Sequence, residues 1–271
     1  MNFKIKYINL AAQHNSIGNE IKREIDNVFK KSAFILRKNV SRFEQKICKI
    51  LGVKYCVSVN SGTDALLFAL SQVGLKKGDE VITPSHTYVA SVSAIDHVGA
   101  VPIFVDIADD FNIDPNLIEK KITKKTKAIM VVHLNGRCCN MNPIIKIAKK
   151  YKLKIIEDAA QGFGSKYNGK YVGNFGYAAA FSLHPMKNLS VPGDGGFLTT
   201  NNKKVFEKVL LLRDHGRIKV GNKEVRKCYG FNSRLDNLHA SIALVKLKYF
   251  FGWMSKRREI AEFYNKELEV I

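Results

Sequence analysis

Mostly apolar runs of strand length alternate with helix-like segments through the first 200 residues of the chain. The runs lie at 55–59, 80–84, 101–106, 127–134, 153–160, 177–183 and 196–200, and segments typical of helices lie at 62–75, 87–99 and 142–152. Strands that are apolar throughout belong to sheets covered on both faces. The order of strands and helices therefore predicts an α/β domain with a mostly parallel sheet.

The pattern changes near residue 235. Apolar residues then recur close to the helical period, at Leu235, Leu238, Ile242, Val245 and Tyr249. The helical pattern continues for more than thirty residues, beyond the usual length of roughly 8–20 residues. We therefore expect Gly252 either to kink this helix or to separate two helices. Residues 1–240, with a helical segment at 1–50, are predicted to form the main domain, and 241–271 a helical connector.

Composition is that of an ordinary soluble protein, with 46% hydrophobic and 25% charged residues. The chain has no run of 18 or more uncharged apolar residues, so no membrane span is expected. Its start lacks the apolar segment of a secretory signal. Five cysteines form no CxxC pair, which favours reduced thiols, a cytoplasmic location and no metal site.

The net charge of +20 raises the question of nucleic acid binding. Residues 116–154 alone contain eleven Lys and Arg residues and one acidic residue, Glu119. No aromatic RNA-binding stripe, zinc-finger spacing or helix-turn-helix pattern accompanies these charges. We therefore expect no nucleic acid partner and interpret the lysines as a solvated surface, with attraction of small anions as a weaker functional reading.

Ligands of parallel α/β sheets bind beyond the carboxyl ends of the strands. The polar residues that end the predicted strands are Ser61, Thr63, Asp106, His133, Asp158 and Ser182. Asp158 follows a buried run, and a buried carboxylate needs a partner. That partner is either structural, as in a helix cap or salt bridge, or the protonated ring nitrogen of a cofactor.

Two further segments complete a possible cofactor site. Ser61–Gly62–Thr63 lies between a strand and a helix, where backbone N–H groups and hydroxyls bind anions, although either hydroxyl could merely cap the helix. Lys187 lies between two apolar runs and precedes the glycine-rich "GDGG" at 193–196. Together these segments offer phosphate donors, a carboxylate and an amine, the three attachments of pyridoxal phosphate.

At this point the chain resembles the DegT/DnrJ/EryC1/StrS family of pyridoxal-phosphate-dependent sugar aminotransferases. The matching stretches run in family order from about residue 50 to 268: "VNSGTDALLFAL", "GDEVITPSHTYVASVSAI", "GAVPIFVDI", "FNIDP", "KAIMVVHLNG", "IIEDAAQGFGSKYNGKYVGNFG", "FSLHPMKNL", "GDGGFLTT" and "GFNSRLDNLHASIALVKLK". The resemblance implies the large domain of fold type I, with a sheet of the seven-stranded type and helices on both faces. It also implies a C-terminal small domain that is largely absent from this chain.

The resemblance assigns roles to residues around the cofactor. Lys187 is expected to form the Schiff base and to move the proton between substrate and cofactor carbons. Asp158 is expected to pair with the pyridinium nitrogen, Gln161 to hydrogen-bond the phenolic oxygen, and Tyr88 to stack on the ring.

The remaining roles concern the phosphate, the substrate and a second subunit. Phosphate binding is expected at Ser61, Gly62, Thr63 and Ser182. Asn232 is expected to reach the phosphate in the neighbouring subunit of a homodimer. His133 and His184 are expected on the substrate side, with simple packing as the alternative for each.

Three positions depart from the family pattern. Asn135 stands where relatives commonly have tyrosine, Phe163 where histidine is frequent, and Tyr177 where aspartate is frequent. None of these positions carries the Schiff-base chemistry, but each departure makes the resemblance a weaker guide to the identity of the sugar.

The function implied is transfer of an amino group, with L-glutamate as the expected donor, to a nucleotide-linked keto-sugar. One alternative is a sugar dehydratase of the same family. Some dehydratases replace the lysine with histidine, so Lys187 favours transamination. The other alternative is a truncated, non-catalytic remnant, against which the retained Lys187, Asp158 and Gln161 argue.

Overall fold

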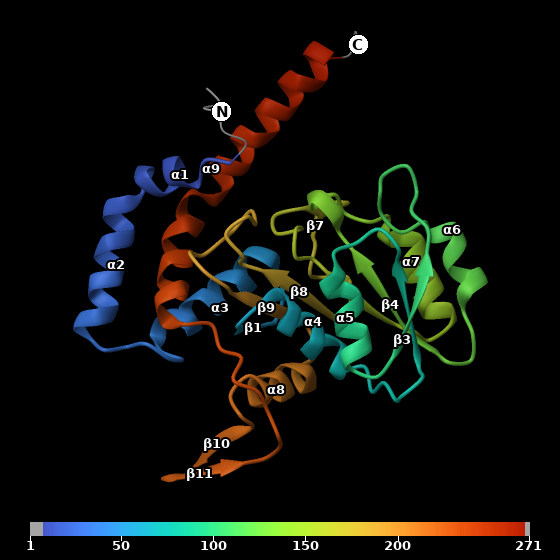
Figure 1. Ribbon diagram of the computed structural model, residues 1–271, viewed down its shortest axis with the longest axis horizontal. Helices are drawn as coiled ribbons and strands as arrows, with labels where there is room; N and C mark the ends of the chain where they lie inside the picture. Colours follow the sequence, from blue (N-terminus) through green and yellow to red (C-terminus); the bar gives the residue numbers. More distant parts are fainter. Residues whose placement is uncertain (1–7, 269–271) are drawn as a thin grey trace.

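The structure is a computed structural model that describes residues 8–268 (Figure 1). Its centre is a seven-stranded sheet with the order β1-β9-β8-β5-β4-β2-β3. The strands are β1 (Tyr55–Val59), β2 (Glu80–Pro84), β3 (Val101–Val105), β4 (Thr126–Val132), β5 (Lys154–Asp158), β8 (Ala178–Ser182) and β9 (Gly196–Thr200). Two small hairpins lie outside the sheet: β6 (Lys166–Tyr167) with β7 (Lys170–Tyr171), and β10 (Arg217–Val220) with β11 (Lys223–Arg226).

The sheet is mostly parallel, as predicted. Strands β3, β2, β4, β5 and β8 pair in parallel. Strand β9 is antiparallel to both of its neighbours, β8 and β1, so β1 runs in the same direction as the other strands. The carboxyl ends of β4, β5 and β8 therefore meet at one edge, where the predicted polar residues lie.

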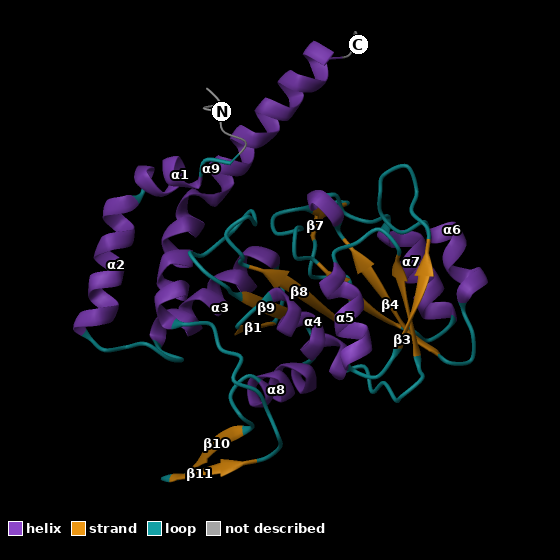
Figure 2. Cartoon of the chain, viewed as in Figure 1, coloured by secondary structure: helices purple, strands orange, loops and turns teal. Residues whose placement is uncertain are grey.

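Helices cover both faces of the sheet (Figure 2). Their bounds are α1 (Leu10–Ser16), α2 (Gly18–Lys30), α3 (Lys38–Leu51), α4 (Gly62–Ser71), α5 (Val89–His97), α6 (Pro115–Ile118), α7 (Met141–Lys150), α8 (Lys203–Leu212) and α9 (Asn237–Leu268), with short 3₁₀ turns at Glu119–Lys121 and Leu134–Gly136. Helices α4, α5 and α8 bury apolar residues against one face. Helices α3 and α9, together with α6 and α7, cover the other. This arrangement explains why the strands lack an alternating polar pattern.

An aromatic cluster fills the core beneath α3 and α9. Phe163 lies against Phe181, Phe197 and Phe250, with ring centroids 6.1, 6.0 and 4.8 Å away, respectively. Phe43 packs edge-on against Phe197. Phe163, one of the three departures from the family pattern, is thus a core residue rather than part of the cavity wall.

Helix α9 is continuous through Gly252, which corrects the expectation that this glycine separates two helices. A glycine inside a helix costs only about 1 kcal/mol relative to alanine. The buried part of α9 extends to Phe250, and the helix packs against α2 and α3. This packing stabilises the first half of α9. The second half, which follows the glycine, is exposed and continues through helical hydrogen bonds.

The predicted elements are correct in type, and their ends differ from the observed ends by at most four residues. Strands at 55–59, 80–84 and 196–200 agree with β1, β2 and β9, whereas β5 is confined to 154–158 within the predicted 153–160. Within residues 8–268, no helix combines the length and the apolar character needed to cross a bilayer.

Candidate active site

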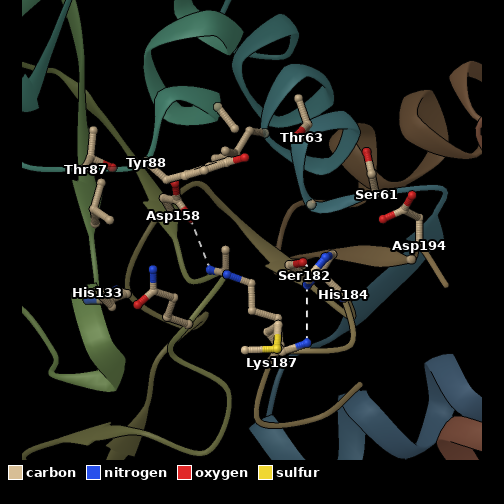
Figure 3. Close-up of a pocket in the computed structure, with 18 residues that line it drawn as sticks. Ser61, Thr63, Thr87, Tyr88, His133, Asp158, Ser182, His184, Lys187 and Asp194 are labelled. Carbon is tan, nitrogen blue, oxygen red and sulfur yellow. Dashed lines mark hydrogen bonds between the residues drawn. The ribbon is translucent and has the colours of Figure 1, made fainter. Parts of the chain in front are cut away.

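A cavity of about 350 Å³ lies at the carboxyl ends of β4, β5 and β8, beside the first turns of α4 and α5 (Figure 3). It contains every residue to which the family resemblance assigned a role, except one, whereas the strand-end candidate Asp106 lines a separate hollow. Its predicted members are Ser61, Gly62, Thr63, Tyr88, His133, Asp158, Gln161, Ser182, His184 and Lys187. Asn232 is exposed and lies outside this cavity, where its backbone bridges to Asp214.

Asp158 ends β5 and is nearly inaccessible, with 5% of its surface exposed. One carboxylate oxygen accepts a hydrogen bond from the backbone N–H of Ala160 at 3.1 Å. The other accepts one from the Ser91 hydroxyl at 2.7 Å. Burial raises the pKa of Asp158, and the hydrogen bonds and nearby His133 and Lys187 oppose that shift.

Lys187 lies in the loop that follows β8, and its side chain is half-buried in the cavity. The backbone N–H of Lys187 donates to the carbonyl oxygen of His184 at 2.8 Å, which folds the loop into a tight turn. Burial lowers the pKa of the Lys187 amine, while the negative charge of Asp158 opposes this shift. The charge of each group therefore affects the pKa of the other.

The first turn of α4 forms the cavity wall predicted to bind an anion. Ser61 caps the helix, because its hydroxyl accepts the N–H of Asp64 at 3.0 Å. A Cβ on Gly62 would lie 2.8 Å from the Ser182 Cβ, and one on Gly196 would lie 2.4 Å from the carbonyl carbon of Ser61. Glycine at both positions lets β8 and β9 approach the helix start closely. The result is a compact pocket of N–H groups and hydroxyls at a positive helix end.

Gln161 and Tyr88 form two further walls. The Gln161 side-chain oxygen accepts the N–H of Asn135 at 2.8 Å, so its amide nitrogen remains as a donor on the other side. Asn135 has a φ of 53°, a left-handed conformation that asparagine tolerates better than most residues. Tyr88, 70% exposed, stands immediately before α5 at the cavity mouth.

His133 lines the cavity, but its side chain is enclosed by the protein. It is fully buried, its Nδ1 accepts the N–H of Cys139 at 3.2 Å, and its Nε2 lies 3.2 Å from the Glu157 carboxylate. Because a backbone N–H can only donate, the proton lies on Nε2 and points at Glu157. Both ring nitrogens are thus engaged within the protein, which suits the packing alternative, although the residue also lines the cavity.

His184 lies at the cavity rim and is exposed. Its Nδ1 accepts the N–H of Met186 at 3.3 Å. The opposite nitrogen, Nε2, has no hydrogen bond among residues 8–268. His184 therefore keeps a group that can meet a ligand.

Sequence reasoning missed Ser91 and Thr87. The hydroxyls of these residues lie 2.7 Å apart, and Ser91 donates in turn to Asp158. Ser91 is fully buried on the inner side of α5. The sequence did contain a signal for Ser91, which lies on the buried face of α5 with Ala94 and Ile95. A buried hydroxyl requires a hydrogen-bond partner, so a polar contact there could have been expected.

Comparisons with known proteins identify the family of this chain. The model of the DegT/DnrJ/EryC1/StrS aminotransferase family matches residues 15–271. The chain is 44% identical to dTDP-3-amino-3,6-dideoxy-alpha-D-galactopyranose transaminase of Aneurinibacillus thermoaerophilus, covering 98% of this chain and 72% of the relative. It is 38% identical to UDP-2-acetamido-2-deoxy-3-oxo-D-glucuronate aminotransferase of Pseudomonas aeruginosa, covering 98% of this chain and 74% of the relative.

Among solved structures, DesV of S. venezuelae in complex with a ketimine intermediate superimposes with a TM-score of 0.93. The two chains are 35% identical, and the match covers 98% of this chain and 71% of DesV. The chain belongs to the DegT/DnrJ/EryC1/StrS aminotransferase family, whose members depend on pyridoxal phosphate.

Proposed function

We propose that this aminotransferase moves an amino group from L-glutamate to the keto carbon of a nucleotide-linked sugar, with Lys187 as the residue that binds the cofactor covalently. The observation that carries the proposal is the coupled pair of half-buried Lys187 and buried Asp158 in one cavity. A pyridine-based cofactor needs an amine of lowered pKa to bind its carbonyl carbon and a carboxylate to pair with its ring nitrogen.

The residues present fit pyridoxal phosphate. The first turn of α4, with Gly62 and Thr63, and the neighbouring Ser182 offer a compact set of phosphate donors. Asp158 would face the ring nitrogen, and the Gln161 amide would donate to the phenolic oxygen. Tyr88 would cover one face of the ring. The cofactor, when bound, supplies an electron-withdrawing ring that stabilises negative charge on the substrate carbon.

The protein's own groups prepare this chemistry. Burial lowers the pKa of Lys187, so more of its amine is neutral near pH 7 and able to attack a carbonyl and accept a proton. Ser91 and Ala160 each donate to one oxygen of Asp158, which fixes the carboxylate plane and favours its charged form. A charged Asp158 is the form that can hold a proton on the ring nitrogen.

The substrate class is supported by the names of the two relatives, one acting on a dTDP-linked and one on a UDP-linked sugar. The retained Lys187 favours transamination over dehydration. The complete set of Lys187, Asp158 and Gln161 in one cavity weighs against a non-catalytic remnant.

We also propose that the protein acts as a cytoplasmic homodimer with shared sites. Asn232 is exposed and outside the cavity of its own chain, which suits a residue that reaches a neighbouring site. All five cysteines are free, which suits a reducing compartment.

The proposal is tested by absorbance spectroscopy. The purified protein with pyridoxal phosphate should show a visible-range band that L-glutamate removes, and borohydride should fix the cofactor to Lys187. Lys187→Ala should lose the fixation, whereas Lys124→Ala, at an exposed lysine, should keep it. Fixation in Lys187→Ala, or a band that glutamate leaves unchanged, would contradict the proposal.

A further inference from the structure

Lys246, on the inner face of α9, is enclosed by the protein although it lies outside the catalytic cavity. Its side chain is only 1% exposed. Its amine donates a hydrogen bond to the Ser190 hydroxyl at 3.0 Å and lies 3.2 Å from Nε2 of His14, in α1. Because a lysine ammonium can only donate, His14 accepts at Nε2. Lys246 therefore joins α9 to α1 and to the loop between β8 and β9 (Figure 1).

The other charged side chains buried in the described part of the chain have partners or a function that explain them. Glu157 accepts three backbone N–H groups, and Arg213 pairs with Glu44. Asp158 lines the catalytic cavity. Among the same residues, Lys246 has no carboxylate within 4 Å. A charge buried without an opposite charge costs free energy.

Lys246 carries this charge at neutral pH in spite of the cost. Burial lowers the pKa of its amine to about 8, so most of the amine is still protonated near pH 7. The titratable group that faces it, His14, has a lowered pKa because of burial and of the positive charge of Lys246. An apolar side chain of similar length could fill the same space without taking a charge out of water. The hydrogen bonds of Lys246, rather than its contribution to stability, therefore need an explanation.

The contact with Ser190 links Lys246 to the proposed cofactor lysine. Ser190 lies three residues after Lys187 in the same loop and is 3% exposed. Its neighbours Leu189 and Val191 are buried in the core cluster that includes the apolar face of α9. Apolar contacts are not directional, so they hold this segment against α9 without fixing its position along the helix. The hydrogen bond from Lys246 supplies that direction.

We propose that Lys246 is a positioning residue for the reaction, which acts through Ser190 to fix the loop that presents Lys187 to the cavity. The inference rests on the proposed function, in which Lys187 binds the cofactor. The Lys187 amine must meet a carbonyl carbon and later a substrate proton in one geometry. A displacement of about 1 Å can slow such a reaction by about a hundredfold. A hydrogen bond from a charged donor is strong enough to hold the loop in place.

The test measures the rate at which L-glutamate removes the visible band of the protein loaded with pyridoxal phosphate. Lys246→Met keeps the approximate length of the side chain and removes its charge and its hydrogen bonds. We expect this variant to react about tenfold or more slowly, because the loop loses its fixed position. The denaturant midpoint should stay at or above the native value, because a buried charge is removed.

Lys248→Met is the matched control, because this lysine lies on the same helix, is exposed and pairs with Glu20. Its rate should stay within about twofold of the native rate. Ser190→Ala should slow the reaction about as much as Lys246→Met. The double variant Ser190→Ala/Lys246→Met should be no slower than Lys246→Met alone, since both changes remove the same contact.

A native rate in either single variant, or rate losses that multiply in the double variant, would overturn the inference. So would a lower denaturant midpoint in Lys246→Met, or its failure to fold, because the lysine would then serve stability. A variant with a native midpoint and no visible band has lost cofactor attachment, which is the extreme form of the expected result.

The native protein separates this inference from the proposed function. If glutamate removes its visible band and the variants respond at the native rate, only the inference fails. If glutamate leaves the native band unchanged, the proposed function fails and the inference fails with it.

Discussion

Asp158 and Lys187 adjust each other's ionisation across the cavity. Burial is the largest influence on both, and it raises the pKa of the acid and lowers that of the amine. Each charge partly reverses the shift of the other. Asp158 therefore has two roles in the proposed site. Its negative charge would hold a proton on the ring nitrogen of the cofactor, and the same charge keeps a larger fraction of the Lys187 amine protonated.

This coupling predicts a pH effect of Asp158→Asn. The negative charge raises the Lys187 pKa, so its removal should move that pKa further below the ordinary value of 10.5. The rate of cofactor attachment, followed by absorbance, should then reach half of its maximum at a lower pH than in the native protein. Turnover should nevertheless fall by roughly a hundredfold or more, because the ring nitrogen loses its counter-charge.

Asp194→Asn is the matched control for this prediction. Asp194 lines the same cavity but does not contribute to the Lys187 shift. An unchanged midpoint in Asp158→Asn, or an equal shift in Asp194→Asn, would show that the two groups are not coupled as described.

At the scale of elements, the site depends on how closely β8 and β9 approach the start of α4. Gly62 and Gly196 occupy positions where a Cβ would meet Ser182 or the Ser61 backbone. The helix start, and with it the proposed phosphate site, is therefore held directly against the sheet.

We expect Gly62→Ala to lower the free energy of unfolding by about 1–3 kcal/mol, the usual cost of overpacking. It should also weaken pyridoxal phosphate binding, because the helix start must move away from Ser182. Gly18→Ala is the control, since its added Cβ would meet nothing within 4 Å. Denaturant titration measures stability and absorbance measures cofactor binding; similar results for the two variants would contradict this account.

At the scale of the whole molecule, the proposed sharing of sites between subunits predicts complementation. Lys187→Ala and Asn232→Ala should each be inactive alone. After subunits are exchanged, a mixed dimer has one site with both changes and one intact site, so an equal mixture should recover roughly a quarter of native activity. The measurement is aminotransferase activity before and after exchange.

Lys187→Ala mixed with Asp158→Asn provides the control. Both residues come from the same cavity, so no intact site can form and no recovery is expected. Recovery in this control, or its absence in the first mixture, would contradict the sharing of sites.

Much of this architecture was predictable because burial leaves a clear pattern in the sequence. Apolar runs gave the strands, and polar residues at their ends gave Asp158 and Ser182. Whether Gly252 separates two helices was not predictable, because a glycine costs a helix only about 1 kcal/mol and helical hydrogen bonds can continue past it. The hydrogen-bond partners of His133 were not predictable either. They are Glu157 and Cys139, which meet His133 only in the folded chain.

The adjacent carboxylates at the end of β5 have a consequence for the integrity of the enzyme. Asp158 faces α5 and the cavity, while Glu157 points to the other side and accepts N–H groups from Gly173, Phe175 and Gly176. Because successive strand residues alternate between faces, slippage of β5 by one position would exchange these two acids. The longer acid would then occupy the place of the shorter one, and the segment at 173–176 would lose its acceptor. The register of β5 thus determines both the position of Asp158 in the cavity and the hydrogen bonds that hold the segment at 173–176.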